Sequence, residues 1–333
     1  MPNSWQYNLT VQHELFKNAV LELGYVGNHN VHWEIRSDIN GVPAASRLTY
    51  VQDSGNGGAR AALRPFGALR GDQTLTYYTR NASSSYNSLQ ALFNMRFTRG
   101  SIFQVAYTWS KLISDTQLID TPGLNVDHYN PSANRGPDQL NRPQILVANM
   151  VYNLSTLQGQ QKYVRGALGS WEISTILNLA SGPSLTPIIN GLSNLGDPSG
   201  TGGAGSLRPM RVPGQPCRAS GPDGRQWFNP NAYTMNGFAL GQIGNSGVGI
   251  CTGPGNSDVD GSLRKNFRIT ERVKMQFSFD FFNLFNHPQY QASSLNMGLK
   301  FTAPNSAALP ESRLPQELGR RASPTQSQSK IPS

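Results

Sequence analysis

The feature that most constrains the fold is a strict two-residue alternation, clearest in the stretch VKMQFSFDFFNLFN, residues 273–286. Large apolar side chains occupy every second position, namely Val273, Met275, Phe277, Phe279, Phe281 and, after Asn283, Phe285. The positions between them begin with Lys274, Gln276, Ser278 and Asp280. Because successive side chains of a β-strand point to opposite faces, this stretch predicts a strand with one apolar and one polar face.

The same alternation recurs in seven further segments, so the sequence predicts eight strands. The segments span residues 4–15, 19–27, 86–97, 101–112, 144–154, 170–181 and 259–269. Most run ten to thirteen residues, which is longer than the five or six residues usual in soluble proteins.

The connections between these segments alternate strictly between short and long. Long excursions are expected at about residues 28–85, 113–143 and 182–258, and the other connections are brief or moderate. In an antiparallel meander, every second connection lies at the same end of the sheet. The sequence therefore predicts that the long connections gather at one end and the short ones at the other.

Long two-faced strands with sorted connections are typical of a transmembrane β-barrel, whose strands need about 9 to 11 residues. Apolar side chains then face lipid and polar ones the lumen. The expected lipid-facing set is Phe93, Phe97, Phe103, Tyr107, Trp109, Trp171, Phe277, Phe279 and Phe281. The expected lumen-facing set includes Gln90, Asn94, Arg96, Gln104, Glu172, Gln276 and Asp280. Interfacial aromatic girdles would include Trp5, Tyr25, Trp109, Tyr152, Trp171 and Phe285. The alternative is a soluble sandwich or barrel whose apolar faces meet each other.

Composition excludes several other classes. Only 14% of residues are charged, against roughly 25% in typical soluble domains. The net charge is +9, but the basic residues are scattered and lack the clustered face with aromatic platforms that nucleic-acid binding needs, so we expect no nucleic-acid partner. No apolar run is long enough for a transmembrane helix, and MPNSWQYNL has no signal-peptide pattern.

Few residues suggest site chemistry. Cys217 and Cys251 are the two cysteines, and they form either a disulfide in the largest loop or two free thiols. His29 and His32 lie three residues apart but lack further metal ligands. The glycine-rich stretches GQIGNSGVG and GDPSGTGGAG do not match a phosphate-binding loop. No catalytic constellation can be assembled, so we expect no enzyme activity, metal or cofactor.

Four stretches are more specific than a generic barrel. They are SYNSLQALFNMRFTRGSIFQVAYTWSKLISD, NRGPDQLNRPQILVANMVYNL, GSWEISTILNLASGPSLTP and GSLRKNFRITERVKMQFSFDFFNLFNHPQY, with AYTWSK, NRGP...NRP and FFNLFNHP as their most specific parts. In this order they resemble the C-terminal part of the barrel of Oar-like TonB-dependent outer-membrane receptors of the acidobacterial type, over roughly residues 1–290. The resemblance implies a barrel of usually 22 strands, closed by an N-terminal plug, that imports bulky substrates with energy passed through TonB.

The expected fold is therefore all-β: an antiparallel transmembrane β-barrel portion of about eight strands, with long extracellular loops and a disordered C-terminal tail. We expect a partial receptor-like barrel over residues 1–302, in which LNMGLKFT is a possible but short ninth strand, and a tail over 303–333. Its partners would be outer-membrane lipid, the remaining strands and the plug, with TonB reached only through an N-terminal part that this chain lacks.

Two other functions stay open. One is a cell-surface β-barrel or β-sheet protein with adhesive or structural loops and no transport activity. The other is a small barrel that the eight strands close by themselves.

Overall fold

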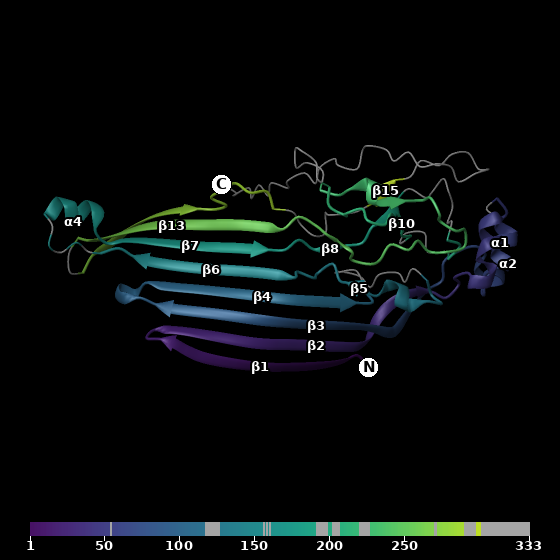
Figure 1. Ribbon diagram of the computed structural model, residues 1–333, viewed down its shortest axis with the longest axis horizontal. Helices are drawn as coiled ribbons and strands as arrows, with labels where there is room; N and C mark the ends of the chain where they lie inside the picture. Colours follow the sequence, from purple (N-terminus) through teal and green to yellow (C-terminus); the bar gives the residue numbers. More distant parts are fainter. Residues whose placement is uncertain are drawn as a thin grey trace.

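A single large antiparallel sheet forms the frame of the molecule (Figure 1). The computed structural model describes residues 1–53, 55–116, 127–155, 157, 159, 161–190, 199–201, 207–219, 227–269, 272–289 and 298–300. The strands follow the order β1-β2-β3-β4-β6-β7-β13-β14, so neighbours along the chain are neighbours in the sheet. The predicted tail, residues 303–333, lies outside the described residues.

All eight predicted strands are present, and the prediction of an antiparallel β fold is confirmed. Their bounds are β1 Asn3–Phe16, β2 Ala19–Asp38, β3 Thr76–Arg96, β4 Ile102–Ser114, β6 Gln144–Asn153, β7 Trp171–Ala180, β13 Asn256–Arg268 and β14 Lys274–Phe281. The two-residue β5 (Gly136–Pro137) extends the sheet beside β4. No helix in the described ranges is long and apolar enough to cross a membrane.

Strands β2 and β3 are longer than the sequence predicted. They remain paired from Ala19↔Met95 to Asp38↔Thr76, so the first long connection is 39–75 instead of 28–85. Beyond Val31 the ladder continues through two irregularities, at Val31/Trp33 and Trp33/Ile35. The alternation fades there, but backbone hydrogen bonds do not require an apolar face, which is why the pattern underestimated these strands.

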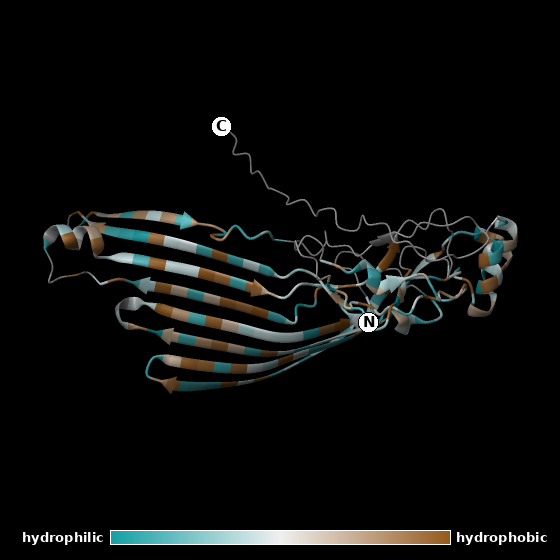
Figure 2. Ribbon diagram, turned by 45° about the horizontal axis from the view of Figure 1, so that its top comes forward, coloured by the Kyte–Doolittle hydropathy of each residue, from teal (hydrophilic) through white to brown (hydrophobic). Residues whose placement is uncertain are grey.

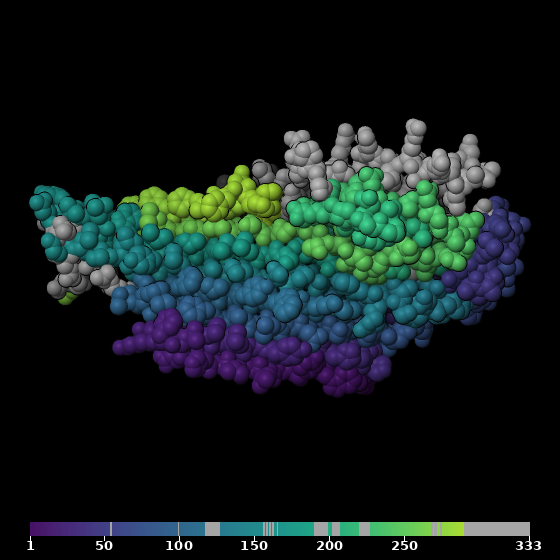
Figure 3. Space-filling model, viewed as in Figure 1, coloured from purple at the N-terminus to yellow at the C-terminus, as the bar shows by residue number. Residues whose placement is uncertain are grey.

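The connections are sorted between the two ends of the sheet, as predicted. One end, here the turn end, carries η2 (Thr98–Gly100) and α4 (Lys162–Leu168). The other, here the loop end, carries the described parts of the three long connections, which lie beyond the ends of most strands (Figures 1 and 3). They form η1 Ala44–Ser46, α1 Arg47–Gln52, α2 Gly57–Ala62, α3 Gly67–Arg70, η3 Pro131–Asn134, β8 Ser184–Leu185, β9 Ile188–Asn190, β10 Met210–Arg211, η6 Pro230–Ala232, β11 Tyr233–Thr234 and β12 Cys251–Thr252.

The possible ninth strand does not join the large sheet at its described residues. The structure describes Gly298–Lys300 of LNMGLKFT, which form β15 and pair in parallel with β9 in the loop-end region and not with β14. This short strand therefore extends a loop pairing and not the sheet.

The two outer strands of the sheet do not meet. In the described part of the chain, β1 pairs with β2 alone and β14 with β13 alone. The alternative of eight strands closing into a small barrel by themselves is therefore wrong, because each outer strand keeps one unpaired edge.

Candidate functional site: the two-faced sheet and the loop-end cluster

One face of the sheet is apolar across all eight strands. In one half of the sheet, consecutive cross-strand partners on this face are Phe279, Leu263, Ile173 and Tyr152. In the other half they are Trp109, Leu89, Tyr25 and Leu9. Hydropathy bands alternate along the strands in Figure 2. We call this surface the apolar face.

The predicted lipid-facing residues gather on this apolar face. The register places there Phe93, Phe103, Tyr107, Trp109, Trp171, Phe277, Phe279 and Phe281, and Phe97 directly follows β3. Phe279 is 51% exposed, so the side chains of this face are left open by the chain itself. Their contact with lipid stays a prediction.

The opposite surface, the polar face, holds the predicted lumen-facing set. The register places Gln90, Asn94, Arg96, Gln104, Glu172, Gln276 and Asp280 there. Cross-strand contacts link several of these side chains: Glu172 pairs with Arg264 at 3.2 Å, and the Gln276 amide donates to Asn266 at 3.0 Å. The polar face is mixed in charge and shows no group arranged for one particular ligand.

The predicted girdle aromatics fall into two groups. Towards the loop end, Trp5 stacks on His29 and Tyr7 on Tyr25, and both tyrosine hydroxyls donate to the side-chain oxygen of Asn87. A groove of about 390 Å³ lies beside them, and its lining includes Tyr25, Asn87, Leu89, Trp109 and Lys111. At the turn end lie Trp171 and Tyr152, near the start of β7 and the end of β6. Phe285 lies beyond the end of β14 and is exposed.

Lys265 is a charged residue on the apolar face that the sequence reasoning missed. It lies opposite Trp171 and Phe277 in the register, yet it is only 3% exposed. Its ammonium donates to the carbonyl oxygens of Ala167 and Gly169 and lies 5.1 Å from the Trp171 ring centre. The signal in the sequence that could have identified Lys265 is a lysine at an apolar position of the alternation, near a strand end. The long side chain of such a lysine can reach polar groups at the membrane–water interface.

The loop end contains a buried ion-pair network that the sequence did not predict. Arg64 contacts Asp72 at 2.7 Å and Asp38 at 3.3 Å, and it donates to the Tyr50 hydroxyl at 2.7 Å. Asp38 is the last residue of β2, so the network fixes the first loop to the sheet. Burial, followed by the hydrogen bond to Asp72, raises the pKa of Tyr50. A second buried pair joins Arg47 to Asp127 at 2.6 Å.

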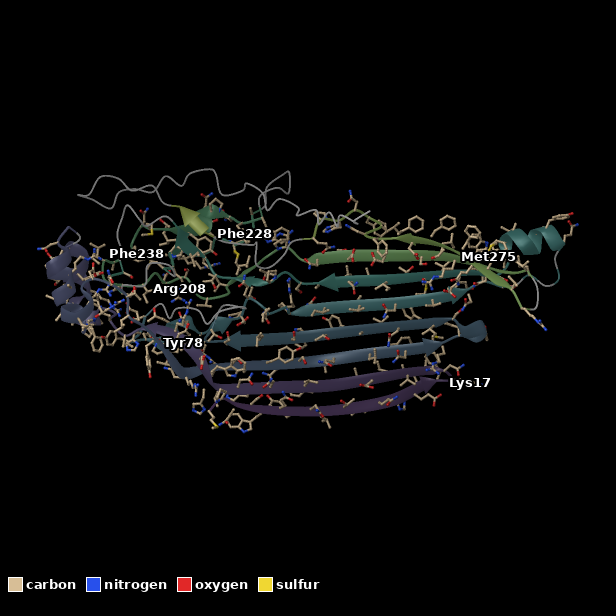
Figure 4. The ribbon with its side chains drawn as sticks, turned by 180° about the vertical axis from the view of Figure 1, so that it is seen from behind. Lys17, Tyr78, Arg208, Phe228, Phe238 and Met275 are labelled. Atoms are coloured by element: carbon tan, nitrogen blue, oxygen red, sulfur yellow. A yellow bond between two sulfur atoms is a disulfide. The ribbon has the colours of Figure 1, made fainter. Side chains whose placement is uncertain are left out.

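Two small apolar cores organise the largest loop. Leu185, Ala232, Tyr233 and Cys251 form one, and Ile189, Leu207 and Phe238 form the other. Cys217 and Cys251 are joined by a disulfide whose Cα atoms lie 5.9 Å apart, so the structure contains the paired alternative. Phe228 and Phe238 both lie in this loop-end region in Figure 4. We call the ion-pair network and these two cores together the loop-end cluster.

The residues considered for metal binding have other surroundings. His29 stacks on Trp5, and His32 has a positive φ of 61° where β2 becomes irregular. Among the described residues, no group of three or more histidine, cysteine or acidic side chains could hold a metal ion.

A family model for the outer membrane beta barrel domain matches residues 1–316 of the chain. No curated protein matches the chain. Among solved structures, the outer membrane transporter YddB from Escherichia coli is similar, with a TM-score of 0.44 and 10% sequence identity. The match covers 86% of this chain and 29% of that one, so the chain spans less than a third of the transporter's length.

Proposed function

Because the chain belongs to the outer membrane beta barrel domain family and lies in the outer membrane, we propose that it forms part of the wall of an Oar-like TonB-dependent receptor. The receptor would take up a bulky substrate across the outer membrane. This proposal joins the family membership to the motif resemblance carried by AYTWSK, NRGP...NRP and FFNLFNHP.

The observation that carries the proposal is an open sheet with one apolar face and, in the described residues, two unpaired edges. Every backbone group left unpaired in hydrocarbon costs several kcal/mol. The free edges of β1 and β14 therefore need further strands, which supports a barrel larger than eight strands. The remaining strands and the plug would come from outside this chain.

In this proposal the chain acts as a passive wall. The polar face would line the conduit, since barrel interiors are polar where they hold water or a plug. The loop-end cluster would face outwards and capture the substrate. Energy coupling through TonB would require the plug segment, so the chain itself would carry no enzyme activity, cofactor or nucleic-acid partner.

A second candidate is an outer-membrane surface protein whose loops mediate adhesion. The compact loop-end cluster, with its disulfide and buried ion pairs, favours this candidate because a rigid surface module suits contact with other surfaces. The two candidates differ in what must accompany the barrel: transport needs a plug and TonB, whereas adhesion needs neither.

The test is to purify the complete gene product from outer membranes, measure its mass and cross-link it in cells. Transport predicts a product much larger than 36.3 kDa that contains a plug and cross-links to TonB. A product with neither a plug nor a TonB cross-link, whose deletion reduces cell attachment, would refute the transport proposal and support adhesion.

A further inference from the structure

Three arginines are buried at the loop end, and two of them are neutralised by the chain's own carboxylates. Arg47 is paired with Asp127, and Arg64 with Asp38 and Asp72. Arg208 is buried to the same degree, at 7% exposed. Within the described ranges, however, no carboxylate forms an ion pair with Arg208, and its buried Nε has no hydrogen-bond partner.

Close packing holds Arg208 in place. Its neighbour Leu207 belongs to the apolar core with Ile189 and Phe238. A Cβ at Gly244 would lie 2.0 Å from the Arg208 carbonyl oxygen, so this second segment packs directly on the arginine's backbone. The Ser246 N–H donates to the Pro209 carbonyl oxygen at 3.1 Å, which ties the two segments together. Arg208 lies among the loop-end elements in Figure 4.

A second polar group on the neighbouring segment is also unsatisfied. Ser246 is 2% exposed, and its hydroxyl has no hydrogen-bond partner in the part of the chain that the structure describes. Buried polar atoms in folded proteins are almost always hydrogen-bonded, so two such groups on adjoining segments require an explanation.

A buried guanidinium without a partner is strongly unfavourable, because the loss of hydration is not repaid by any attraction. Guanidinium groups do not lose their proton in proteins, so Arg208 cannot avoid this cost by becoming neutral. Burial lowers its pKa from the ordinary arginine value, which reports the same loss of hydration. Since no carboxylate of the described residues pairs with Arg208, an anion from outside the chain would supply what Asp127 and Asp72 supply to the other two arginines.

We propose that Arg208, with the hydroxyl of Ser246 on the adjoining segment, forms a binding site for an anionic group of an external ligand, either a carboxylate or a phosphate. The planar guanidinium fork matches the oxygens of both groups. The site itself does not depend on the transport role. Only the further step, that the bound ligand is the imported substrate, rests on the proposed function.

The direct test is calorimetric titration of the complete gene product in detergent with inorganic phosphate and, separately, with acetate. Binding should weaken by at least about tenfold in Arg208→Gln, the usual loss when a charged hydrogen-bond partner is removed. Arg218→Gln is the matched control, since it removes an exposed charge from the same loop, over Trp227, and should leave binding unchanged. The stronger of the two probes identifies the anionic group.

A stability measurement separates a ligand site from a structural arginine. In buffer without phosphate or carboxylates, Arg208→Gln should leave unchanged or raise the temperature at which chymotrypsin cleaves the loop end. Arg64→Gln should lower that temperature, because it breaks ion pairs within the chain. The proposal is overturned if Arg208→Gln destabilises the loop end as Arg64→Gln does, or if neither anion binds the wild type more tightly than Arg208→Gln.

Discussion

The sheet and the loop-end cluster place their apolar side chains in opposite directions. On the sheet, Phe277 and Phe279 point away from the chain and remain about half exposed. In the loop-end cluster, Leu207 and Tyr233 are almost completely buried among neighbouring loop residues. The same chain therefore treats apolar side chains in two ways: the sheet leaves them open, as the predicted contact with lipid requires, whereas the loops bury them away from water.

Charged groups show the same contrast. On the sheet, Glu172 and Arg264 form a partly exposed pair on the polar face. In the loop-end cluster, Arg64 and Asp38 are both nearly inaccessible and depend on each other for compensation. We therefore expect that removing one partner of a buried ion pair destabilises the loop-end cluster more than removing one partner of the exposed pair destabilises the sheet.

The largest effect is expected from Arg64→Leu. It leaves Asp38 and Asp72 without their cation, and removing one partner of a buried pair costs about 3–5 kcal/mol. Denaturant titration, followed by chymotrypsin cleavage of the loop end, measures this loss. Arg80→Gln is the control, because its pair with Glu34 is exposed and contributes about 0–1 kcal/mol. Similar losses of stability in both variants would mean that burial does not increase the cost of breaking an ion pair in this protein.

The next effect tests the two faces of the sheet. Phe279→Arg places a charge on the apolar face and should impair assembly by about 2–4 kcal/mol if the residue lies near the bilayer midplane. Ser278→Arg places the same charge on the polar face and should be tolerated. Folding of the complete gene product into lipid vesicles under urea titration measures both. Equal effects would contradict the assignment of the apolar face to lipid.

A smaller effect is expected from removing the disulfide. Replacing Cys217 and Cys251 together with serine should destabilise the loop-end cluster by about 2 kcal/mol, the lower end of the usual range. The reason is that β7 and β13 already hold both ends of this loop. Vesicle assembly of the sheet should not change. If assembly failed in this variant, the loop and the sheet would not fold as separable parts.

The smallest effect is expected from replacing Lys265, the charged residue on the apolar face of the sheet. Lys265→Met removes the ammonium from the Trp171 ring and the Ala167 carbonyl oxygen but adds an apolar side chain to an apolar face. We expect a loss below about 1 kcal/mol in the same vesicle assay. A gain in assembly of about 2–4 kcal/mol would instead show that Lys265 lies in the hydrocarbon and not at its edge.

Several elements could be predicted because their signals are local. The alternation Met275, Phe277, Phe279 defines a strand and its faces within one segment. The lengths of the connections then predict which of them lie at each end of the sheet. The extension of β2 to Asp38 was missed, since its pairing with β3 continues after the alternation ends. The site of β15 was also missed, because a three-residue strand can join any free backbone within reach.

The amino-acid sequence by itself determined the eight long strands, their two faces and the sorting of the connections, because a period of two needs no knowledge of distant residues. Tertiary structure alone decided which charges are buried. The residues next to Arg64 and Arg208 in the sequence do not reveal how the two arginines differ. Arg64 pairs with Asp38, which is 26 residues away in the sequence, whereas Arg208 pairs with no carboxylate in the described residues. The free energy of a charge depends on the groups that surround it in space, and only folding brings those groups together.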